Sequence, residues 1–287
     1  MKIQEDIKYW ADKIIDLAIE EDLANMSDIT SDYSILEDKD VKFVLSARQD
    51  MVLCGSIFIP IVFKKISKRY KYNNIYFKQH FLDGNKIHLG QNIISGEGNA
   101  RLIFASERII LNLLQNLSAI ATKTNKFISK INNSKTKILD TRKTIPAFRH
   151  LHKYAVKIGG GQNHRFSLFD AILIKDNHIA AAGSVDKVLQ QICSKNLNIP
   201  IEIECDNLDQ VRDAIKYDID IIMLDNMDIN QMKEAKKIIA NKVKIEVSGG
   251  INFKKINDIL DLDVDYISIG ELTNSIQAVD IGLDIEF

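Results

Sequence analysis

The sequence has few cysteines and no long apolar run. Its three cysteines, Cys54, Cys193 and Cys205, are far apart among 287 residues. They form neither a Cys-x-x-Cys metal motif nor a disulfide framework, which favours a reducing compartment, and we expect the cytoplasm. No apolar run reaches the ~18 residues of a membrane-spanning helix. The first residues are too polar for a signal peptide. A secreted, membrane or zinc-finger protein is therefore not expected.

An excess of charge of either sign is also missing. Lys and Arg total 38 and Asp and Glu total 39, so the formal net charge is −1. A nucleic-acid-binding protein usually has a basic excess or stripe, and we expect no such partner. Hydrophobic residues make up 46% and charged residues 27%, which is the usage of a folded globular protein. The length allows one large domain or two of medium size.

Proline and glycine are scarce, at 3 and 13 residues. Six of the glycines occur in three places: residues 159–161, residues 249–250 and Gly270. Because the rest of the chain has so few, these clusters indicate points where the backbone turns sharply or approaches a ligand closely.

The first ~100 residues read as mixed α and β. We expect a helix over residues 8–23, strands over 41–45 and 72–81, and an apolar segment with a helical tail over 57–66. A long helix is predicted over 101–131, which contains no glycine or proline. This helix is apolar on more than one face, as expected of a helix that packs partly against a second chain.

From residue 137 the pattern changes to short apolar strands that alternate with helices. Strands are predicted over 137–140, 171–175, 201–204, 219–224, 243–247 and 266–269, and helices over 208–217, 230–240 and 253–260. The alternation implies βαβ units and a parallel sheet, as in a complete or partial (β/α) barrel. An open doubly wound sheet is the alternative, but it usually has a glycine-rich turn after its first strand.

Polar residues follow every one of these strands. In an α/β barrel, the carboxyl ends of the strands form the active-site face. The predicted rim therefore combines cations, carboxylates and glycine turns: Thr141, Arg142, Lys143, Lys175, Glu204, Asp225, Ser248, Gly249, Gly250, Gly270 and Glu271. Glu204 and Asp225 suit ribose hydroxyls, Mg²⁺ or a developing positive charge. The glycine turns suit a phosphate.

Residues 141–178 contain seven Lys or Arg and two Asp, a local charge of +5 that leaves −6 for the remainder. Four cations flank strand ends or the glycine triplet and predict a multiply anionic small ligand: Arg142, Lys143, Arg165 and Lys175. Three others are spaced as one solvated helix face: Arg149, Lys153 and Lys157. His164 alone reads as structural, although a ligand or acid–base role is open, and His150 and His152 are expected on a helix surface.

Several motifs in order resemble the quinolinate phosphoribosyltransferase family, also called carboxylating nicotinate-nucleotide pyrophosphorylase. The resemblance covers almost the whole chain. The motifs are Asp140-Thr141-Arg142-Lys143-Thr144-Ile145-Pro146, Gly159-Gly160-Gly161, Asn163-His164-Arg165, Lys175-Asp176-Asn177-His178, Leu224-Asp225-Asn226 and Ser248-Gly249-Gly250-Ile251.

The resemblance implies an N-terminal α/β sandwich domain over 1–105 and an incomplete (β/α) TIM-like barrel over 106–273, with residues 274–287 packed on the first domain. It implies a homodimer that joins quinolinate to phosphoribosyl pyrophosphate with Mg²⁺ and releases pyrophosphate and CO₂. The implied catalytic residues are Lys143, Lys175, Glu204 and Asp225, the last two also for the metal. Implied substrate ligands are Arg108 from the neighbouring subunit, the rim residues above, His164 and Arg165.

Three positions depart from the family pattern, and other readings stay open. Asn274 stands where a histidine is common, and Ala147 and Ser167 stand where glycine is usual. The Asn274 change could weaken phosphate contacts, and the other two concern loop geometry. The alternatives are a related family encoded beside molybdenum transporters, a Schiff-base aldolase that uses Lys175, and a non-catalytic binding paralogue.

Overall fold

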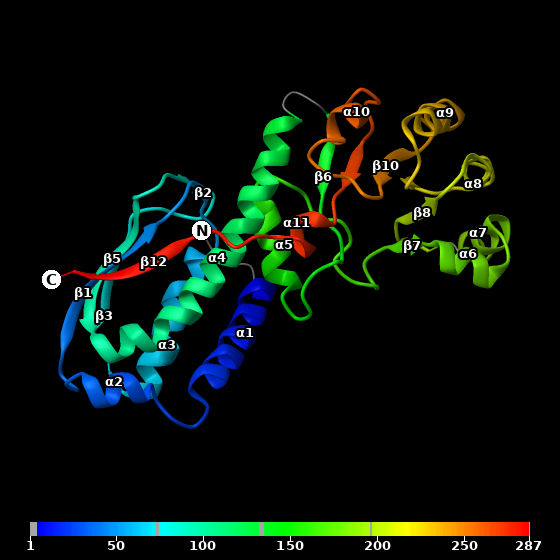
Figure 1. The fold of residues 1–287 in the computed structure, drawn as a ribbon. Coiled ribbons are helices and arrows are strands. Elements are labelled where there is room, and N and C mark those ends of the chain that lie inside the picture. The colour runs from blue at the N-terminus through cyan, green and yellow to red at the C-terminus, as the bar shows by residue number, and fades with distance from the viewer. Residues whose placement is uncertain (1–4, 73–74, 132–134, 196, 287) are drawn as a thin grey trace. The chain divides into compact units, whose positions relative to one another are not determined.

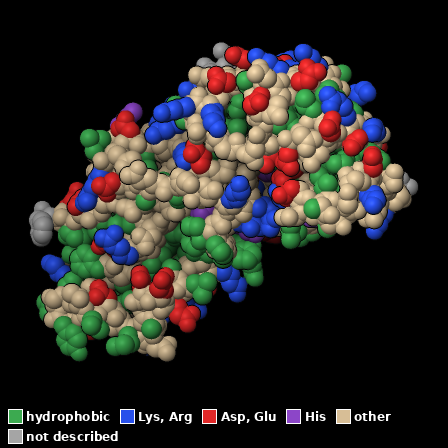
Figure 2. Space-filling model, turned by 45° about the vertical axis from the view of Figure 1, so that its right-hand side comes forward, with side chains coloured by type: hydrophobic (Ala, Val, Ile, Leu, Met, Phe, Trp, Pro, Cys, Tyr) green, Lys and Arg blue, Asp and Glu red, His purple; other side chains and the backbone are tan. Residues whose placement is uncertain are grey.

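The computed structural model describes residues 5–72, 75–131, 135–195 and 197–286, in two compact units (Figure 1). Unit 1 comprises Met1–Asn125, Thr144–Gly160 and Ser275–Phe287, and unit 2 comprises Lys126–Lys143 and Gly161–Asn274. Unit 1 carries an antiparallel sheet and unit 2 a parallel one, so the predicted α/β fold class is confirmed. On the face in Figure 2, basic and acidic side chains are interspersed.

The sheet of unit 1 has the strand order β12-β1-β5-β3 within the described residues. Its strands are β1 (Asp40–Ala47), β3 (Ile75–Gln79), β5 (Asn92–Asn99) and β12 (Ile281–Glu286). The expected strands at 41–45 and 72–81 correspond to β1 and β3, although residues 73–74 lie outside the described residues. Strand β5 was not expected. β12 pairs with β1, which brings the end of the chain onto this sheet.

Among the described residues, five helices belong to unit 1, and α3 packs on its sheet. They are α1 (Glu5–Leu23), α2 (Ile29–Ser34), α3 (Ile59–Tyr70), α4 (Ala100–Lys130) and α5 (Arg149–Ile158), and the unit also contains the short 3₁₀ turn η1 (Ser56–Phe58) and the small ladder of β2 (Met51–Val52) and β4 (Lys86–Ile87). Phe63 of α3 contacts Phe43 of β1 and Phe77 of β3 at ring-centroid distances of 6.0 and 5.2 Å. These aromatic contacts join the helix to the sheet.

The expected boundary after residue 105 does not coincide with the edges of the two units. Helix α4 runs through that position without a break, and α5 belongs to unit 1 although it follows the first barrel strand. A Cβ on Gly159, at the end of α5, would lie 2.5 Å from the carbonyl oxygen of Ala121 in α4. Glycine therefore permits the close approach of these two helices.

Two expectations about α5 are wrong. Lys153 and His152 have no exposed surface, whereas a solvated face and a helix surface were expected. The physical reason is that residues 151–156 are all buried, so the central turn of the helix is enclosed on every side. Burial lowers the pKa of His152 to about 4, which keeps the imidazole neutral. His150 is half-buried and stacks on Trp10 at 5.0 Å.

Unit 2 is a parallel sheet in the order β6-β11-β10-β9-β8-β7. The strands are β6 (Lys137–Leu139), β7 (Ile172–Ile174), β8 (Ile201–Cys205), β9 (Ile221–Asp225), β10 (Lys244–Ser248) and β11 (Tyr266–Ser268), each within a predicted segment or one residue beyond it. Its helices are α6 (Asp176–Ala182), α7 (Val185–Cys193), α8 (Leu208–Ala214), α9 (Ile229–Ile239), α10 (Ile256–Leu260) and α11 (Glu271–Asn274). Among the described residues no pairing joins β6 to β7, so the barrel is incomplete.

No helix in the described part of the chain combines the length and the apolar character that crossing a membrane requires.

Asp83 connects three segments of unit 1. Its carboxylate accepts hydrogen bonds from the backbone N–H groups of Gly55 and Ser56 at 2.9 and 2.8 Å, and from the Ser56 hydroxyl at 2.6 Å. The Tyr154 hydroxyl of α5 donates to it at 2.7 Å. Burial, followed by the charge of Asp83, raises the pKa of Tyr154, so this hydroxyl stays protonated and remains a donor.

We predict that Asp83→Asn lowers the free energy of unfolding by about 2–4 kcal/mol, because the amide places an N–H₂ group against hydrogen-bond donors and removes the charge. Urea unfolding followed by circular dichroism measures the change. Asp38→Asn, at an exposed position of the same unit, is the matched control and should be neutral. Equal stability of the two variants would contradict the role of Asp83.

Candidate active site

A cavity of about 350 Å³ lies in unit 2. Nine of its lining residues were predicted from the strand ends and motifs: Thr141, Arg142, Lys143, His164, Arg165, Lys175, Glu204, Asp225 and Ser248. Leu173, Met223 and Ser268 complete the lining. The parallel register explains this gathering, because the carboxyl ends of neighbouring strands meet at one edge of the sheet.

The four predicted cations all face this cavity. Burial, followed by the nearby charge of Arg142, lowers the pKa of Arg165. The Nε atoms of Arg142 and Arg165 are buried and have no hydrogen-bond partner among the described residues. Buried donors without partners are costly. An anionic ligand would satisfy them and reduce the repulsion between the two guanidinium groups.

Lys175 and Glu204 form an ion pair between the ends of β7 and β8. Burial raises the pKa of the Glu204 carboxyl, and the Lys175 ammonium partly opposes that rise. The backbone N–H of Lys175 donates to Nδ1 of His178 at 2.9 Å, which fixes the start of α6. The pair therefore gives the cavity a cation whose position is set by a neighbouring strand.

Glu204 and Asp225 come from the adjacent strands β8 and β9. The charge of Asp225 contributes to the raised pKa of Glu204, so the two carboxyl groups interact. The side-chain amide of Asn226 donates to Oδ2 of Asp225 at 2.7 Å. Carboxylate oxygens at the mouth of a polar cavity are the donors that Mg²⁺ takes together with substrate phosphates. The donor set present therefore fits Mg²⁺.

The glycine turns lie beside the cavity lining and not within it. Gly249 and Gly250 have φ values of +94° and +58°. A Cβ on Gly249 would lie 2.5 Å from the backbone nitrogen of Asn226, whereas a Cβ on Gly250 would meet only the Lys255 ammonium, at 3.9 Å. Lys255 is thus a further cation at this turn, and it was not expected from the sequence. The phosphate cradle stays a prediction.

Gly270 and Glu271 stand at the start of α11. A Cβ on Gly270 would lie 3.2 Å from Cδ of Lys143 and 3.5 Å from the side-chain nitrogen of Asn274. Asn274 therefore has its amide beside this glycine, where the family commonly has histidine. Glu271 is half-buried and does not line the cavity.

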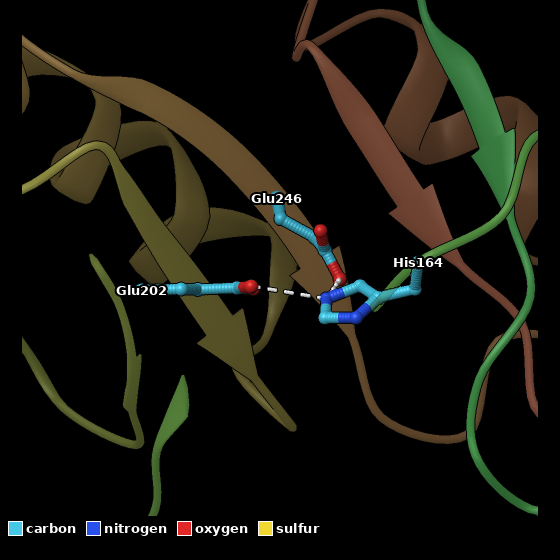
Figure 3. A group of neighbouring side chains, drawn as sticks. All are labelled: His164, Glu202 and Glu246. Atoms are coloured by element: carbon cyan, nitrogen blue, oxygen red, sulfur yellow. Dashed lines mark ion pairs between the residues drawn. The ribbon is translucent and has the colours of Figure 1, made fainter. Parts of the chain in front are cut away.

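The buried Glu202 and Glu246 and the half-buried His164 form a cluster that was not expected from the sequence (Figure 3). Nε2 of His164 lies 3.0 Å from Oε2 of Glu202 and 3.5 Å from Oε1 of Glu246. The Ser268 hydroxyl donates to Glu246. Burial, followed by the charge of Glu202, raises the pKa of Glu246 to about 8. The available signal was the spacing: Glu202 and Glu246 each stand two residues before a cavity residue of the same strand.

Arg108 does not belong to this cavity. It lies on α4 in unit 1, with 67% of its side chain exposed, and its Nη2 is 3.8 Å from Oε1 of the neighbouring Glu107. The apolar side chains of α4, such as Leu114 and Ile120, are buried within the chain itself. Their distribution over several faces therefore needs no second chain to explain it.

Two family models match the chain in sequence order. The model of the quinolinate phosphoribosyl transferase N-terminal domain matches residues 28–118, and that of the C-terminal domain matches residues 120–284. A probable nicotinate-nucleotide pyrophosphorylase [carboxylating] of Methanocaldococcus jannaschii is 40% identical, covering 97% of this chain and 98% of that protein.

Solved structures agree with this relation. The nicotinate-nucleotide pyrophosphorylase from Francisella tularensis superposes with a TM-score of 0.90 at 40% identity, covering 99% of this chain and 98% of that chain. The enzyme from Ehrlichia chaffeensis gives 0.90 at 41% identity, with both chains fully covered. The chain therefore belongs to the quinolinate phosphoribosyltransferase family, the carboxylating nicotinate-nucleotide pyrophosphorylases, which are pentosyltransferases of NAD biosynthesis.

Proposed function

We propose that the cavity of unit 2 binds quinolinate and phosphoribosyl pyrophosphate together and converts them to nicotinate mononucleotide, pyrophosphate and CO₂. The observation that carries the proposal is the meeting of four cations and two carboxylates on one cavity: Arg142, Lys143, Arg165, Lys175, Glu204 and Asp225. Quinolinate is a dianion and phosphoribosyl pyrophosphate a polyanion, so both need cations. The ribose carbon that becomes electron-poor needs carboxylates.

The cations divide by geometry into two kinds. Arg142 and Arg165 carry planar guanidinium groups with buried, unpartnered Nε atoms, which suit the flat carboxylates of quinolinate. Lys143 is exposed at the rim and Lys175 is tied to Glu204, so each supplies a point charge for carboxylate or pyrophosphate oxygens.

The transfer step needs no nucleophile from the protein. The pyridine nitrogen of quinolinate attacks the anomeric carbon of the ribose, and pyrophosphate leaves with the electron pair of the broken C–O bond. Positive charge develops on the ribose in between, and the carboxylates of Glu204 and Asp225 stabilise it electrostatically. Glu204 and Asp225 would also hold Mg²⁺, directly or through water or substrate; bound there, the ion neutralises charge on the leaving pyrophosphate.

Decarboxylation follows on the same ligand. Loss of CO₂ leaves an electron pair at ring carbon 2, next to the newly quaternised nitrogen, and a proton then takes the place of the carboxylate. The cations of the cavity stabilise the negative charge until the proton arrives. The 5′-phosphate is assigned to the turn at Ser248, Gly249 and Gly250 with Gly270, where Asn274 and Lys255 add donors.

A homodimer completes the proposal. Arg108 is exposed and lies outside the cavity of its own unit 2, and by family resemblance it serves the site of the partner. Leu168 and Phe169, 71% and 85% exposed, follow Arg165 closely and would be covered by a second chain. The cytoplasmic location and the lack of a nucleic-acid partner stay predictions.

We predict that quinolinate, and not nicotinate, is the acceptor, because the cations exceed what a single carboxylate and a pyrophosphate require. Product formation from each acid with phosphoribosyl pyrophosphate, followed by chromatography and CO₂ release, gives kcat/KM for both. Arg165→Gln should raise the KM for quinolinate, whereas Arg212→Gln on the exposed face of α8 should leave it unchanged. If nicotinate reacts as well as quinolinate, the substrate assignment is wrong.

We predict that Glu204→Ala and Asp225→Ala each lower kcat at least ~100-fold, the scale of losing one electrostatic contact in a transition state. Both residues stand at strand ends beside the cavity, so the variants should unfold at temperatures near that of the wild type. Turnover is measured at saturating substrate with a range of Mg²⁺ concentrations. A variant with near-normal kcat would remove that residue from the mechanism.

Subunit mixing tests Arg108. Arg108→Ala and Lys143→Ala chains, each inactive as homodimers, are unfolded together and refolded into mixed dimers. If Arg108 acts across the interface, both lesions fall in one site and the other is wild type, so we predict about half of the normal activity per mixed dimer.

The absence of activity in the mixed dimers would contradict the prediction. If Arg108 serves its own chain, each site of the mixed dimer keeps one lesion and no activity returns. Wild-type chain carried through the same procedure is the control for refolding, either inactive chain refolded alone gives the background, and a differential tag isolates the mixed dimers before the assay.

A further inference from the structure

Glu202 and Glu246 are buried acids that the proposed chemistry does not use. Their residue exposures are 4% and 0%, and they come from β8 and β10, two strands that are not neighbours in the sheet. Figure 3 shows both side chains directed at one edge of the His164 ring. Oε1 of Glu202 and Oε2 of Glu246 have no hydrogen-bond partner among the described residues.

Such an arrangement costs stability. Two carboxyl groups in a dry interior repel each other when both are ionised, and each loses its hydration. The raised pKa of Glu246 reflects this cost. Burying apolar side chains of similar size in a barrel core would cost less free energy. The position therefore calls for a function that an apolar pair would not provide.

The hydrogen bonds of His164 indicate what that function is. Nδ1 of its ring accepts the backbone N–H of Arg165 at 2.8 Å. Nε2 must then carry the ring proton, and it faces the two carboxyl groups. Both ring nitrogens are thus engaged inside the protein. A direct contact between His164 and the substrate stays a prediction, because His164 also lines the cavity.

The backbone around His164 is held as well. Its N–H donates to Oδ1 of Asp140 at 2.9 Å, and the side-chain amide of Asn163 donates to Oδ2 of Asp140 at 2.6 Å. Asp140 is fully buried at the end of β6. Residues 163–165 are therefore tied to β6 by the backbone and to β8 and β10 by the His164 ring, and the next side chain along, Arg165, enters the cavity.

We propose that Glu202 and Glu246 are positioning residues for quinolinate binding, an inference that rests on the proposed function. They orient the His164 ring, the ring holds the backbone N–H of Arg165, and Arg165 is thereby aimed at a carboxylate of quinolinate. Neither glutamate touches the substrate. The cluster holds the loop residues 163–165 against the strands of the barrel. The Arg165 guanidinium, although it is carried by a loop, is therefore held as firmly as a side chain on a strand.

The test is a double-mutant cycle. Glu202→Met and Glu246→Met remove the acceptors at similar side-chain length, and each is made in the wild type and in an Arg165→Ala background. The KM for quinolinate, the KM for phosphoribosyl pyrophosphate, kcat and the melting temperature are measured for all of them. Glu234→Gln, on the surface of α9, is the control and should change none of these values.

In the wild-type background we expect the KM for quinolinate to rise ~10-fold, the scale of one charge-assisted hydrogen bond. The KM for phosphoribosyl pyrophosphate should stay within about twofold of the wild-type value. In the Arg165→Ala background the same changes should raise the KM less than twofold, because the group that they position is gone. A rise of equal size in both backgrounds, or an unchanged KM, would overturn the proposal.

If the methionine variants fail to fold, Glu202→Leu and Glu246→Leu, which also remove the acceptors, go through the same comparison. An effect on quinolinate KM that is absent without Arg165 supports positioning, and no effect in either background overturns it. Failure of the proposed function is a separate outcome, since the wild-type protein would then form no nicotinate mononucleotide at all.

Discussion

The repulsion among cations gathered at one cavity is the constraint on which the rest of unit 2 depends. Burial, followed by the charge of Arg142, lowers the pKa of Arg165, and both residues are partly buried. Like charges held this close disfavour one another's charged form. Lys175 is balanced by Glu204 on the next strand, and Arg165 has the buried Glu202 and the more exposed Glu204 within electrostatic range. The balance is partial, which leaves room for an anionic substrate to supply the rest.

Much of this arrangement is predictable because parallel strands have one sequence signature and one functional edge. Short apolar runs separated by helices predicted β6 to β11, and the residue after each run predicted where polar groups gather. The local charge of +5 over residues 141–178 indicated the ligand class. These inferences need only the chain direction of each strand, and a boundary error of one residue does not change them.

The sequence did not reveal which polar residues are buried, because burial depends on elements that are distant in the chain. Glu202 and Glu246 look like ordinary charges in apolar runs, and nothing local says that they face inward and meet the ring of a residue from a distant loop. Lys153 and His152 show the same problem, since their burial comes from elements that pack around the middle of α5. Strand β5, Asn92–Asn99, includes two glycines and lacks a clean alternation, so its pairing with β1 and β3 defines it more than its residues do.

The departures from the family pattern can be separated by backbone geometry. Ala147 has φ of +67°, a left-handed conformation that costs a side chain about 1–2 kcal/mol, so a glycine is easily understood there. Ser167 is not among the residues with positive φ, and its N–H donates to Asp170 at 3.0 Å, so serine fits without strain. Asn274 keeps a donor beside Gly270 and lacks only the titratable ring of a histidine.

Two acids of the same strand, β8, differ in how deeply they are buried and in what they contact. Glu202 and Glu204 are two residues apart on β8 and face the same side of the sheet. The outer one keeps 14% of its side chain exposed, pairs with Lys175 and reaches the mouth of the cavity, where ribose or Mg²⁺ would meet it. The inner one, Glu202, keeps 6% of its side chain exposed, and its Oε2 lies 3.0 Å from Nε2 of His164. In the proposed mechanism, β8 thus supplies an acid for the reaction and, two residues earlier and deeper in the unit, an acid that positions Arg165 through His164.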